Sequence, residues 1–132
     1  MAWKVFGSRA KRLEDPALLT GRARFVDDIR MPGLLHAAFV RSPHGHAAIQ
    51  GIDAKAARAL PGVHAVYSFV DFEPHLVEPR LIVGLPSKAY RQDVNRPVLA
   101  VDEVVHVGEP VAIVVAESRY IAEDAAALVA VD

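Results

Sequence analysis

Apolar and polar residues alternate along this chain with two different periods, which predicts short strands interleaved with helices. Residues 34–41, LLHAAFVR, have the pattern of a mostly buried strand, and residues 63–70, VHAVYSFV, that of a strand with apolar residues on both faces. Three β-branched segments near the end of the chain predict further strands. They span residues 98–101, 104–107 and 111–116, and polar and glycine-proline breaks separate them.

Turn and capping residues predict where the first helix begins and ends. The segment LEDPALLTG predicts a short helix with Asp15 as its N-cap, Pro16 in its first position and Gly21 just past its end. Residues 23–33, ARFVDDIRMPG, predict a short strand closed by a Pro-Gly turn. Residues 49–53, IQGID, predict another short extended piece.

Two further helices are predicted from caps and periodicity. Asp53 is expected to cap a helix over about residues 53–60, which stops at Pro61-Gly62. Ser118 is expected to cap another over about 118–130, whose apolar residues keep a helical spacing. Interleaved strands and helices without an internal repeat predict the α+β class, with a mixed β-sheet of short strands and these two main helices.

The chain has the length and composition of one globular domain. Its 132 residues are 52% hydrophobic and 23% charged, which predicts a single domain over residues 1–132. It has no apolar run of the roughly 18 residues that cross a membrane, no secretory h-region and no cysteine. We therefore expect a soluble cytoplasmic protein with no membrane partner. Residues 71–96 contain three prolines and predict an irregular excursion of the kind that is often functional or lies against a partner.

Charge is unevenly distributed, although the net charge is only -1. Residues 1–41 hold eight Lys and Arg against four Asp and Glu, whereas the remaining 91 residues hold seven against twelve. The basic residues, among them Arg9, Lys11 and Arg12, are mixed with acidic ones, so nucleic-acid binding is the less favoured interpretation. We expect residues 1–14 to form a basic arm that lies on an acidic surface of this protein or of a partner.

The segment VRSPHGHA holds the main candidates for chemistry. In an extended segment His44 and His46 point to the same face, so both imidazoles could reach one metal ion. Zinc needs a third ligand, and no other histidine has a ligand-like spacing. His44 could also act as a base for Ser42, but that serine lacks the strand-to-helix turn that exposes a nucleophile.

Other polar motifs predict structure rather than catalysis. Adjacent carboxylates such as Asp27-Asp28 and Asp102-Glu103 lie at turns, and on a strand they would face opposite sides. Gly108 has neither the further glycines nor the Lys-Ser/Thr of a phosphate-binding loop, and it predicts a backbone bend before a buried strand. We expect no self-contained active site in this chain.

Three segments, in this order, carry a resemblance to a known family. They are RLEDPALLTGRARFVDDIRMPGLLHAAFVRSPHGHAAI, IDAKAARALPGVHAV and RPVLAVDEVVHVGEPVAIVVAESRYIAEDAAALV. Together they resemble the N-terminal α/β hammerhead domain of molybdenum hydroxylase large subunits, the family of xanthine dehydrogenase, aldehyde oxidase and carbon monoxide dehydrogenase. The resemblance extends from Arg12 to Val131 and implies the hammerhead fold.

The resemblance implies a structural and interface role. In that family molybdopterin is held by larger domains that follow the hammerhead, and iron–sulfur clusters and FAD lie on partner domains or subunits. None of those segments occurs here, which implies a chain that binds no cofactor or metal and is not catalytic alone. It would be either an excised domain or a short product that works with a companion large subunit and an iron–sulfur subunit. The residues interpreted as structural or interface residues are Arg9, Arg12, Arg41, Ser42, His44, His46 and Gly108.

Two alternatives stay open on the sequence. One is a free-standing binding module that uses His44 and His46, with or without His36, for a metal or a small anion. The other is a small structural subunit of a split enzyme. In each case we expect that the isolated domain can self-associate through apolar surface that a larger assembly would cover.

Overall fold

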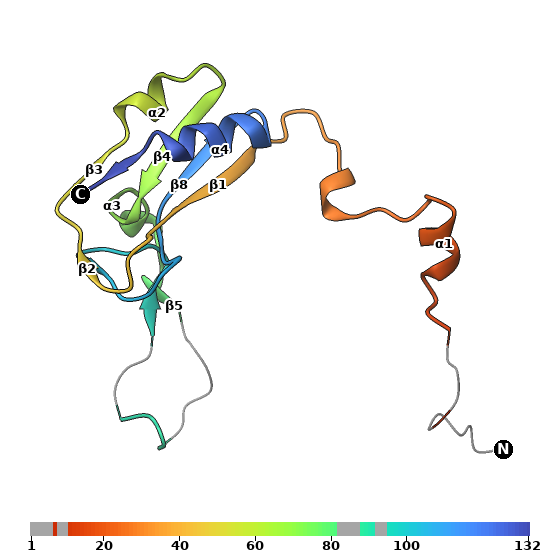
Figure 1. The fold of residues 1–132 in the computed structure, drawn as a ribbon, viewed down its shortest axis with the longest axis horizontal. Helices are drawn as coiled ribbons and strands as arrows, with labels where there is room; N and C mark the ends of the chain where they lie inside the picture. Colours follow the sequence, from red (N-terminus) through yellow and green to blue (C-terminus); the bar gives the residue numbers. More distant parts are fainter. Residues whose placement is uncertain (1–6, 8–10, 82–87, 92–94) are drawn as a thin grey trace. The chain divides into compact units, whose positions relative to one another are not determined.

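The fold is that of a computed structural model, which describes residue 7 and residues 11–81, 88–91 and 95–132. Its contacts divide the chain into two compact units, Met1–Leu34 and Leu35–Asp132. The first unit contains helix α1 (Asp15–Leu19) and the short 3₁₀ helix η1 (Val26–Asp28). Figure 1 shows the path of the chain through both units.

The second unit holds all the strands that the described residues form. They are β1 (His36–Arg41), β2 (Ala47–Ala48), β3 (Ile52–Asp53), β4 (Val63–Ser68), β5 (Arg80–Leu81), β6 (Arg96–Pro97), β7 (Glu103–Val104), β8 (Pro110–Ala116) and β9 (Ala130–Val131). Its helices are α2 (Lys55–Ala59), α3 (Phe69–Phe72), the 3₁₀ helix η2 (Glu73–His75) and α4 (Arg119–Ala127). These elements confirm the α+β class.

A three-stranded sheet of order β1-β8-β4 forms the centre of this unit. Both neighbours are antiparallel to β8, and the register places Phe39 opposite Ile113 and Ile113 opposite Tyr67. Antiparallel two-stranded pairs join β2 to β7, β3 to β9 and β5 to β6. The long β8 is the buried, β-branched strand expected at residues 111–116.

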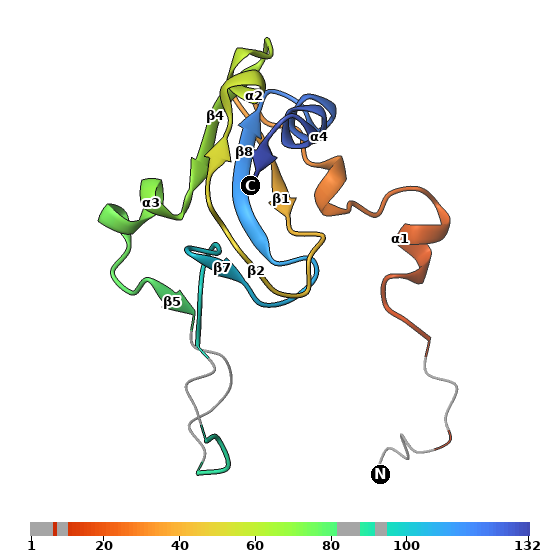
Figure 2. The same ribbon diagram turned by 60° about the vertical axis from the view of Figure 1, so that its left-hand side comes forward.

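Helices α2 and α4 lie on the same side of the central sheet (Figure 2). Small side chains on the helices, Ala57 and Ala125, pack with Val66 and Val114 of the sheet and are buried with them. A second apolar cluster joins Ala100, Val104 and Val111. Burial of aliphatic side chains in these two clusters stabilises the packing of the short strands and the helices against the central sheet.

Two features of the first unit differ from the sequence predictions. Helix α1 begins at Asp15 with Glu14 as its N-cap, so the predicted cap is off by one residue. The strand predicted over residues 23–33 is wrong, because Val26–Asp28 form a 3₁₀ turn. There the Phe25 N–H donates a hydrogen bond to Asp28 Oδ2 at 2.9 Å, which closes the turn locally.

Strand β4 also ends earlier than predicted. The chain enters α3 at Phe69, because the Asp71 carboxylate accepts hydrogen bonds from the Ser68 N–H at 2.7 Å and the Ser68 hydroxyl at 2.9 Å. A side chain that satisfies these donors at the first turn favours a helix over continued strand. The excursion of residues 71–96 therefore opens with helical turns and the β5 strand.

Corrections in the last third of the chain have similar causes. Residues 98–101 form bends rather than a strand, and Ala100 N–H donates to Pro110 O at 2.8 Å outside any ladder. The strand predicted at 104–107 ends at Val104, since the Glu109 carboxylate takes the N–H of Val105 at 2.6 Å. Helix α4 ends at Ala127, and Ala130–Val131 instead pair with β3.

The helix caps predicted from sequence agree more closely. Ser118 caps α4, and its hydroxyl accepts the Ile121 N–H at 3.2 Å. Helix α2 begins at Lys55 with Ala54 in the N-cap position, while Asp53 Oδ1 accepts the Lys55 N–H at 2.9 Å. The Asp53 carboxylate thus accepts the first N–H of α2, although Asp53 lies one residue before the N-cap position. No helix of the described residues is long and apolar enough to cross a membrane.

Candidate functional site

Most of the residues singled out from the sequence meet at one corner of the second unit, formed by residues 41–46 and 103–109. Two backbone hydrogen bonds join the two segments. Ser42 N–H donates to Glu109 O at 3.0 Å, and Gly108 N–H donates to Ser42 O at 2.8 Å. We call this region the histidine corner.

Ser42 is buried at the histidine corner, with 8% of its surface exposed. Its hydroxyl accepts the His44 N–H at 3.0 Å and donates to His44 O at 3.3 Å. Both of these bonds are local and close a turn of three residues. The Ser42 hydroxyl is therefore engaged with backbone groups of its own turn.

His44 and His46 have different surroundings. The His46 Nε2 lies 2.8 Å from Glu103 Oε2, and both side chains are exposed. This contact lies beside the β2–β7 pair, where Ala47 is opposite Val104. His44 instead lines a cleft of about 240 Å³ together with Ala47, Val104 and Val111 among its apolar walls.

The His44 and His46 imidazoles are candidate metal ligands by sequence. Among the residues that the structure describes, no group of three or more His, Asp or Glu side chains could hold a metal ion. The His46 ring is paired with a carboxylate that the sequence suggested only as a turn residue. The histidine-based binding module thus lacks a third ligand in the described part of the chain.

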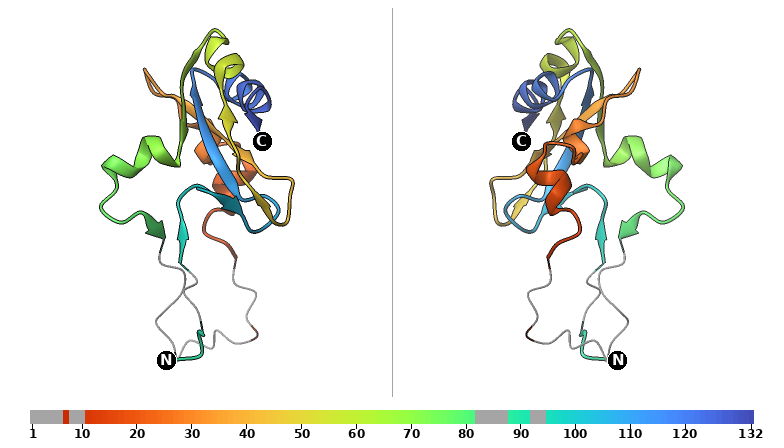
Figure 3. Two further views of the ribbon diagram at one scale, coloured as in Figure 1. Left: turned by 90° about the vertical axis from the view of Figure 1, so that its left-hand side faces the viewer. Right: turned by 90° about the vertical axis from the view of Figure 1, so that its right-hand side faces the viewer.

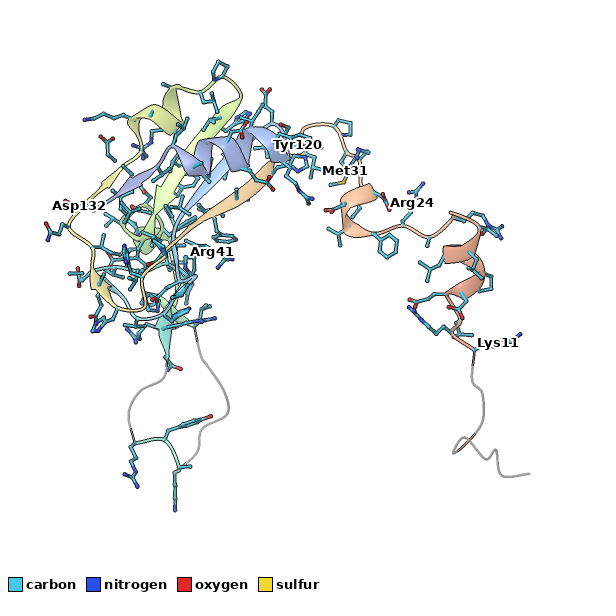
Figure 4. The ribbon with its side chains drawn as sticks, in the orientation of Figure 1. Lys11, Arg24, Met31, Arg41, Tyr120 and Asp132 are labelled. Carbon is cyan, nitrogen blue, oxygen red and sulfur yellow. The ribbon has the colours of Figure 1, made fainter. Side chains whose placement is uncertain are left out.

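Arg41 and Gly108 lie on opposite segments of the histidine corner and contact each other. Arg41, at the end of β1 (Figure 4), donates from Nη1 to Gly108 O at 2.8 Å. Its guanidinium carbon lies 5.2 Å from the centre of the Phe39 ring, within the range of a cation–π contact. Gly108 has φ +85°, so it supplies the backbone bend predicted before β8.

The sequence interpretation missed Glu109. Its side chain is 5% exposed, accepts the Val105 N–H at 2.6 Å and has His106 Nδ1 at 3.5 Å from its Oε2. A glutamate held between a glycine and a proline, just before a buried strand, is the signal that could have marked it. It anchors the 103–109 segment from inside.

The predicted arm residues lie in the other unit. Arg9 lies outside the described residues. Arg12 is exposed and contacts Glu14 at 3.1 Å and Asp15 at 3.9 Å. These exposed pairs add little to stability, so the geometry of Arg12 is one of local ion pairing.

Hydrogen bonds join the end of β1 to the segment just before β8 at the histidine corner. The Arg41 guanidinium, the Ser42 hydroxyl and the Glu109 carboxylate each bond to backbone groups. The described residues bring together no nucleophile, base and orienting group.

Comparison with known proteins identifies the relatives of this chain. The model of the aldehyde oxidase and xanthine dehydrogenase a/b hammerhead domain matches residues 20–132. The nicotine 6-hydroxylase large subunit of Paenarthrobacter nicotinovorans is 46% identical over 97% of this chain. The carbon monoxide dehydrogenase large chain of Afipia carboxidovorans is 43% identical over 96% of it.

A solved structure is also similar to this chain in both sequence and fold. Quinoline 2-oxidoreductase from Pseudomonas putida 86 superposes with a TM-score of 0.82 at 42% identity, over 93% of this chain and 15% of that one. The chain likewise spans about 15% of the length of the two curated relatives. The matched region of these relatives is thus a small part of each.

Proposed function

Because this chain belongs to the aldehyde oxidase and xanthine dehydrogenase family of α/β hammerhead domains, we propose that it serves as the hammerhead domain of a molybdenum-dependent oxidoreductase large subunit. The observation that carries the proposal is the match of residues 20–132 to the hammerhead model, together with 46% identity to a large subunit over nearly the whole chain. In this role the chain is a single structural domain of residues 1–132. The hydrogen bonds of its histidine corner stabilise the contact between the end of β1 and the segment before β8.

Molybdopterin is the cofactor of the proposed parent enzyme. No residue of this chain is proposed to hold it, because the family resemblance assigns molybdopterin to the larger domains that follow the hammerhead. We therefore assign no step of the chemistry to this chain. The redox work belongs to other domains, with iron–sulfur clusters and FAD on partner domains or subunits.

Substrate choice is also placed outside this domain. Relatives named for nicotine, carbon monoxide and quinoline carry closely similar versions of it, at 46%, 43% and 42% identity to this chain. A domain that is similar in three enzymes with such different substrates is a poor candidate for the part that distinguishes them.

The proposed partners are the remaining large-subunit domains and an iron–sulfur subunit. One relative is named as subunit gamma of a dehydrogenase complex, which supports assembly with companion chains. A cytoplasmic location is part of the proposal, and a chain without cysteine suits a reducing compartment. The basic arm, residues 1–14, and the excursion, residues 71–96, are the segments proposed to cover the partner.

Native purification tests the proposal. The untagged gene product is purified from its source cells, and molybdenum, iron and pterin are measured in whatever accompanies it. We expect to recover a molybdenum- and pterin-containing large subunit that includes this domain or holds it bound. A chain that purifies alone with stoichiometric zinc, lost in the His44→Ala/His46→Ala double variant, would favour the binding module instead.

The role of the arm has its own test. Replacing Arg9, Lys11 and Arg12 together by Ala is expected to weaken assembly with the partner, more so at low salt than at high salt. Arg22→Ala, also a basic residue of the first unit, serves as the control. Unchanged assembly in the triple variant would remove the arm from the proposal.

A further inference from the structure

The central sheet has a second face, opposite helices α2 and α4, and that face is apolar too. Side chains alternate along a strand, so the burial of Val66 and Val114 under the helices sends their strand neighbours to the other side. The register then places one row across the three strands at Phe39, Ile113 and Tyr67. A second row holds Ala37, Val115 and Ala65. We call these six residues the outer face.

Antiparallel sheets that face water on one side normally alternate apolar and polar residues, with the polar ones outward. The outer face departs from this rule, since none of its six residues is charged. Phe39 and Tyr67 nonetheless leave 46% and 39% of their surface exposed. A contiguous apolar patch of this kind on a folded domain marks an interaction surface. Figure 3 shows the sheet from its two edges, with α2 and α4 on one side of it.

The two aromatic side chains at the edges of the outer face, Phe39 and Tyr67, are each held by a contact within the domain. Arg41 lies over the Phe39 ring and is held by the Gly108 carbonyl. At the other edge the Tyr67 ring packs against Phe72 of α3, with 5.4 Å between ring centroids. Aromatic residues and arginine are enriched in the centres of protein interfaces, whereas lysine and glutamate are depleted there. Side chains that are fixed beforehand also lose less entropy on binding.

We infer that the outer face is buried against the remaining polypeptide of the large subunit, which contributes an apolar surface centred on Phe39, Ile113 and Tyr67. This inference rests on the proposed function. The curated relatives devote only about 15% of their length to the matched region, so most of the large subunit lies outside it. A segment of the same large subunit meets the face at a far higher effective concentration than a separate chain does, which favours it over a second copy.

Photo-cross-linking in the native complex tests the inference. The Tyr67 codon is changed in the gene at its natural locus so that p-benzoylphenylalanine is incorporated at position 67. The molybdenum-containing complex is then purified and irradiated. Mass spectrometry identifies the cross-linked peptides. We expect cross-links to large-subunit peptides outside residues 1–132. The same replacement of Tyr120, which is 79% exposed on α4, controls for incorporation and assembly.

The possible outcomes are distinct. Cross-links to the 132-residue chain itself, to a second copy of it or to the iron–sulfur subunit would overturn the inference and leave the proposed function standing. So would an intact complex that gives no cross-link from position 67. If no molybdenum-containing complex is recovered from the unaltered gene, the proposed function fails at the purification step, and this inference fails with it.

Polar substitutions give a second, independent measurement. Phe39→Ser with Tyr67→Ser is expected to lower the yield of assembled complex about tenfold or more. The 132-residue chain alone should still unfold in one cooperative transition, at a lower temperature because about half of each side chain is buried there. Tyr120→Ser is the matched control and should leave the yield unchanged. An equal loss of complex from Tyr120→Ser, or full assembly of the double variant, would contradict the inference.

Discussion

At the residue scale, Gly62 carries a tight structural requirement. It has φ +86°, and a Cβ placed on it would lie 2.8 Å from the Ile121 Cδ1 atom. Gly62→Ala should therefore destabilise the fold by about 1–3 kcal/mol, chiefly through backbone strain at this positive φ, because the Ile121 Cδ1 atom ends a side chain that can shift. Urea unfolding measures this cost. Gly45→Ala is the control, since a Cβ there meets nothing within 4 Å, and an equal cost at both positions would contradict the explanation.

Glu109 offers a second prediction at this scale. Glu109→Ala removes the acceptor of the Val105 N–H and should cost about 1–3 kcal/mol, because that donor is left without its partner. Glu103→Ala removes only the exposed pair with His46 and should cost less than about 1 kcal/mol. The two free energies of unfolding, measured side by side, separate a buried anchor from a surface contact. Equal values would show that Glu109 is not an anchor.

Individual residues also show what the sequence could and could not reveal. The local roles of Ser42, Gly108 and Ser118 follow from short-range chemistry, so turn and capping rules predict them. The partner of His46 is Glu103, 57 positions away, and the buried state of Glu109 depends on how two distant segments cross. No local rule contains that information.

At the scale of elements, α4 depends on small residues where it meets the sheet. Ala125 is fully buried in the cluster with Val66 and Val114. Ala125→Leu should destabilise the chain by about 1–3 kcal/mol, because extra methyl and methylene groups must displace packed neighbours. Ala127→Leu, on the exposed side of the same helix, should change stability by about 0.5 kcal/mol or less. Thermal unfolding of both variants checks the orientation of α4, and the reverse ranking would contradict it.

Helix α3 is stabilised by a carboxylate, which makes it sensitive to pH. The Ser68 N–H is the main reason that the pKa of Asp71 lies below its ordinary value. The ionised form therefore favours folding, and its contribution is present above about pH 3.9 and is lost as the pH falls through the lowered pKa. Asp71→Asn should cost about 0.5–1 kcal/mol at pH 7.

That cost should shrink as the pH approaches about 3, since the carboxyl of the unaltered chain is then increasingly protonated. Urea unfolding of the chain and of Asp71→Asn at both pH values measures the two differences. Asp124→Asn, an exposed change on α4, is the control. A difference that is the same at pH 7 and pH 3 would mean that the charge of Asp71 plays no part.

The accuracy of the predicted elements depends on their length. Strand β8 and helix α4 have long, regular patterns and were predicted with only small errors at their ends. The errors fell on short pieces, where a single side chain decides the outcome. Asp28 turns a predicted strand into η1, Asp71 begins α3 within a predicted strand, and Glu109 ends β7 early.

At the scale of the whole molecule, the outer face makes the isolated chain prone to associate. Sedimentation velocity over a range of concentrations should show reversible self-association of the 132-residue chain, because association removes exposed apolar surface from water. Ile113→Lys should reduce it by placing a charge in the middle row of the face. Val77→Lys, a change of similar kind at an exposed position outside the face, should not. Equal association of both variants and the unaltered chain would point to another surface.

Fold class and family were predictable at this scale because several weak motifs occur in a fixed order along nearly the whole chain. The proposed contact of the outer face could be anticipated only in outline. The apolar character of residues 63–70 on both faces was visible in the sequence, yet the pairing of Phe39, Ile113 and Tyr67 into one row depends on the register of three strands. That register is set by tertiary packing.

The central position of β8 has a consequence for how the chain is made. Strands β1 and β4 each pair with β8, so a ribosome that has synthesised them has not yet produced the strand that joins them. Both must wait, with their hydrogen-bonding edges open, until residues 110–116 leave the exit tunnel. Such distant pairings slow folding and lengthen the time during which nascent strands can aggregate. Chaperones that bind exposed strands are thus expected to help this domain most while it is still being translated.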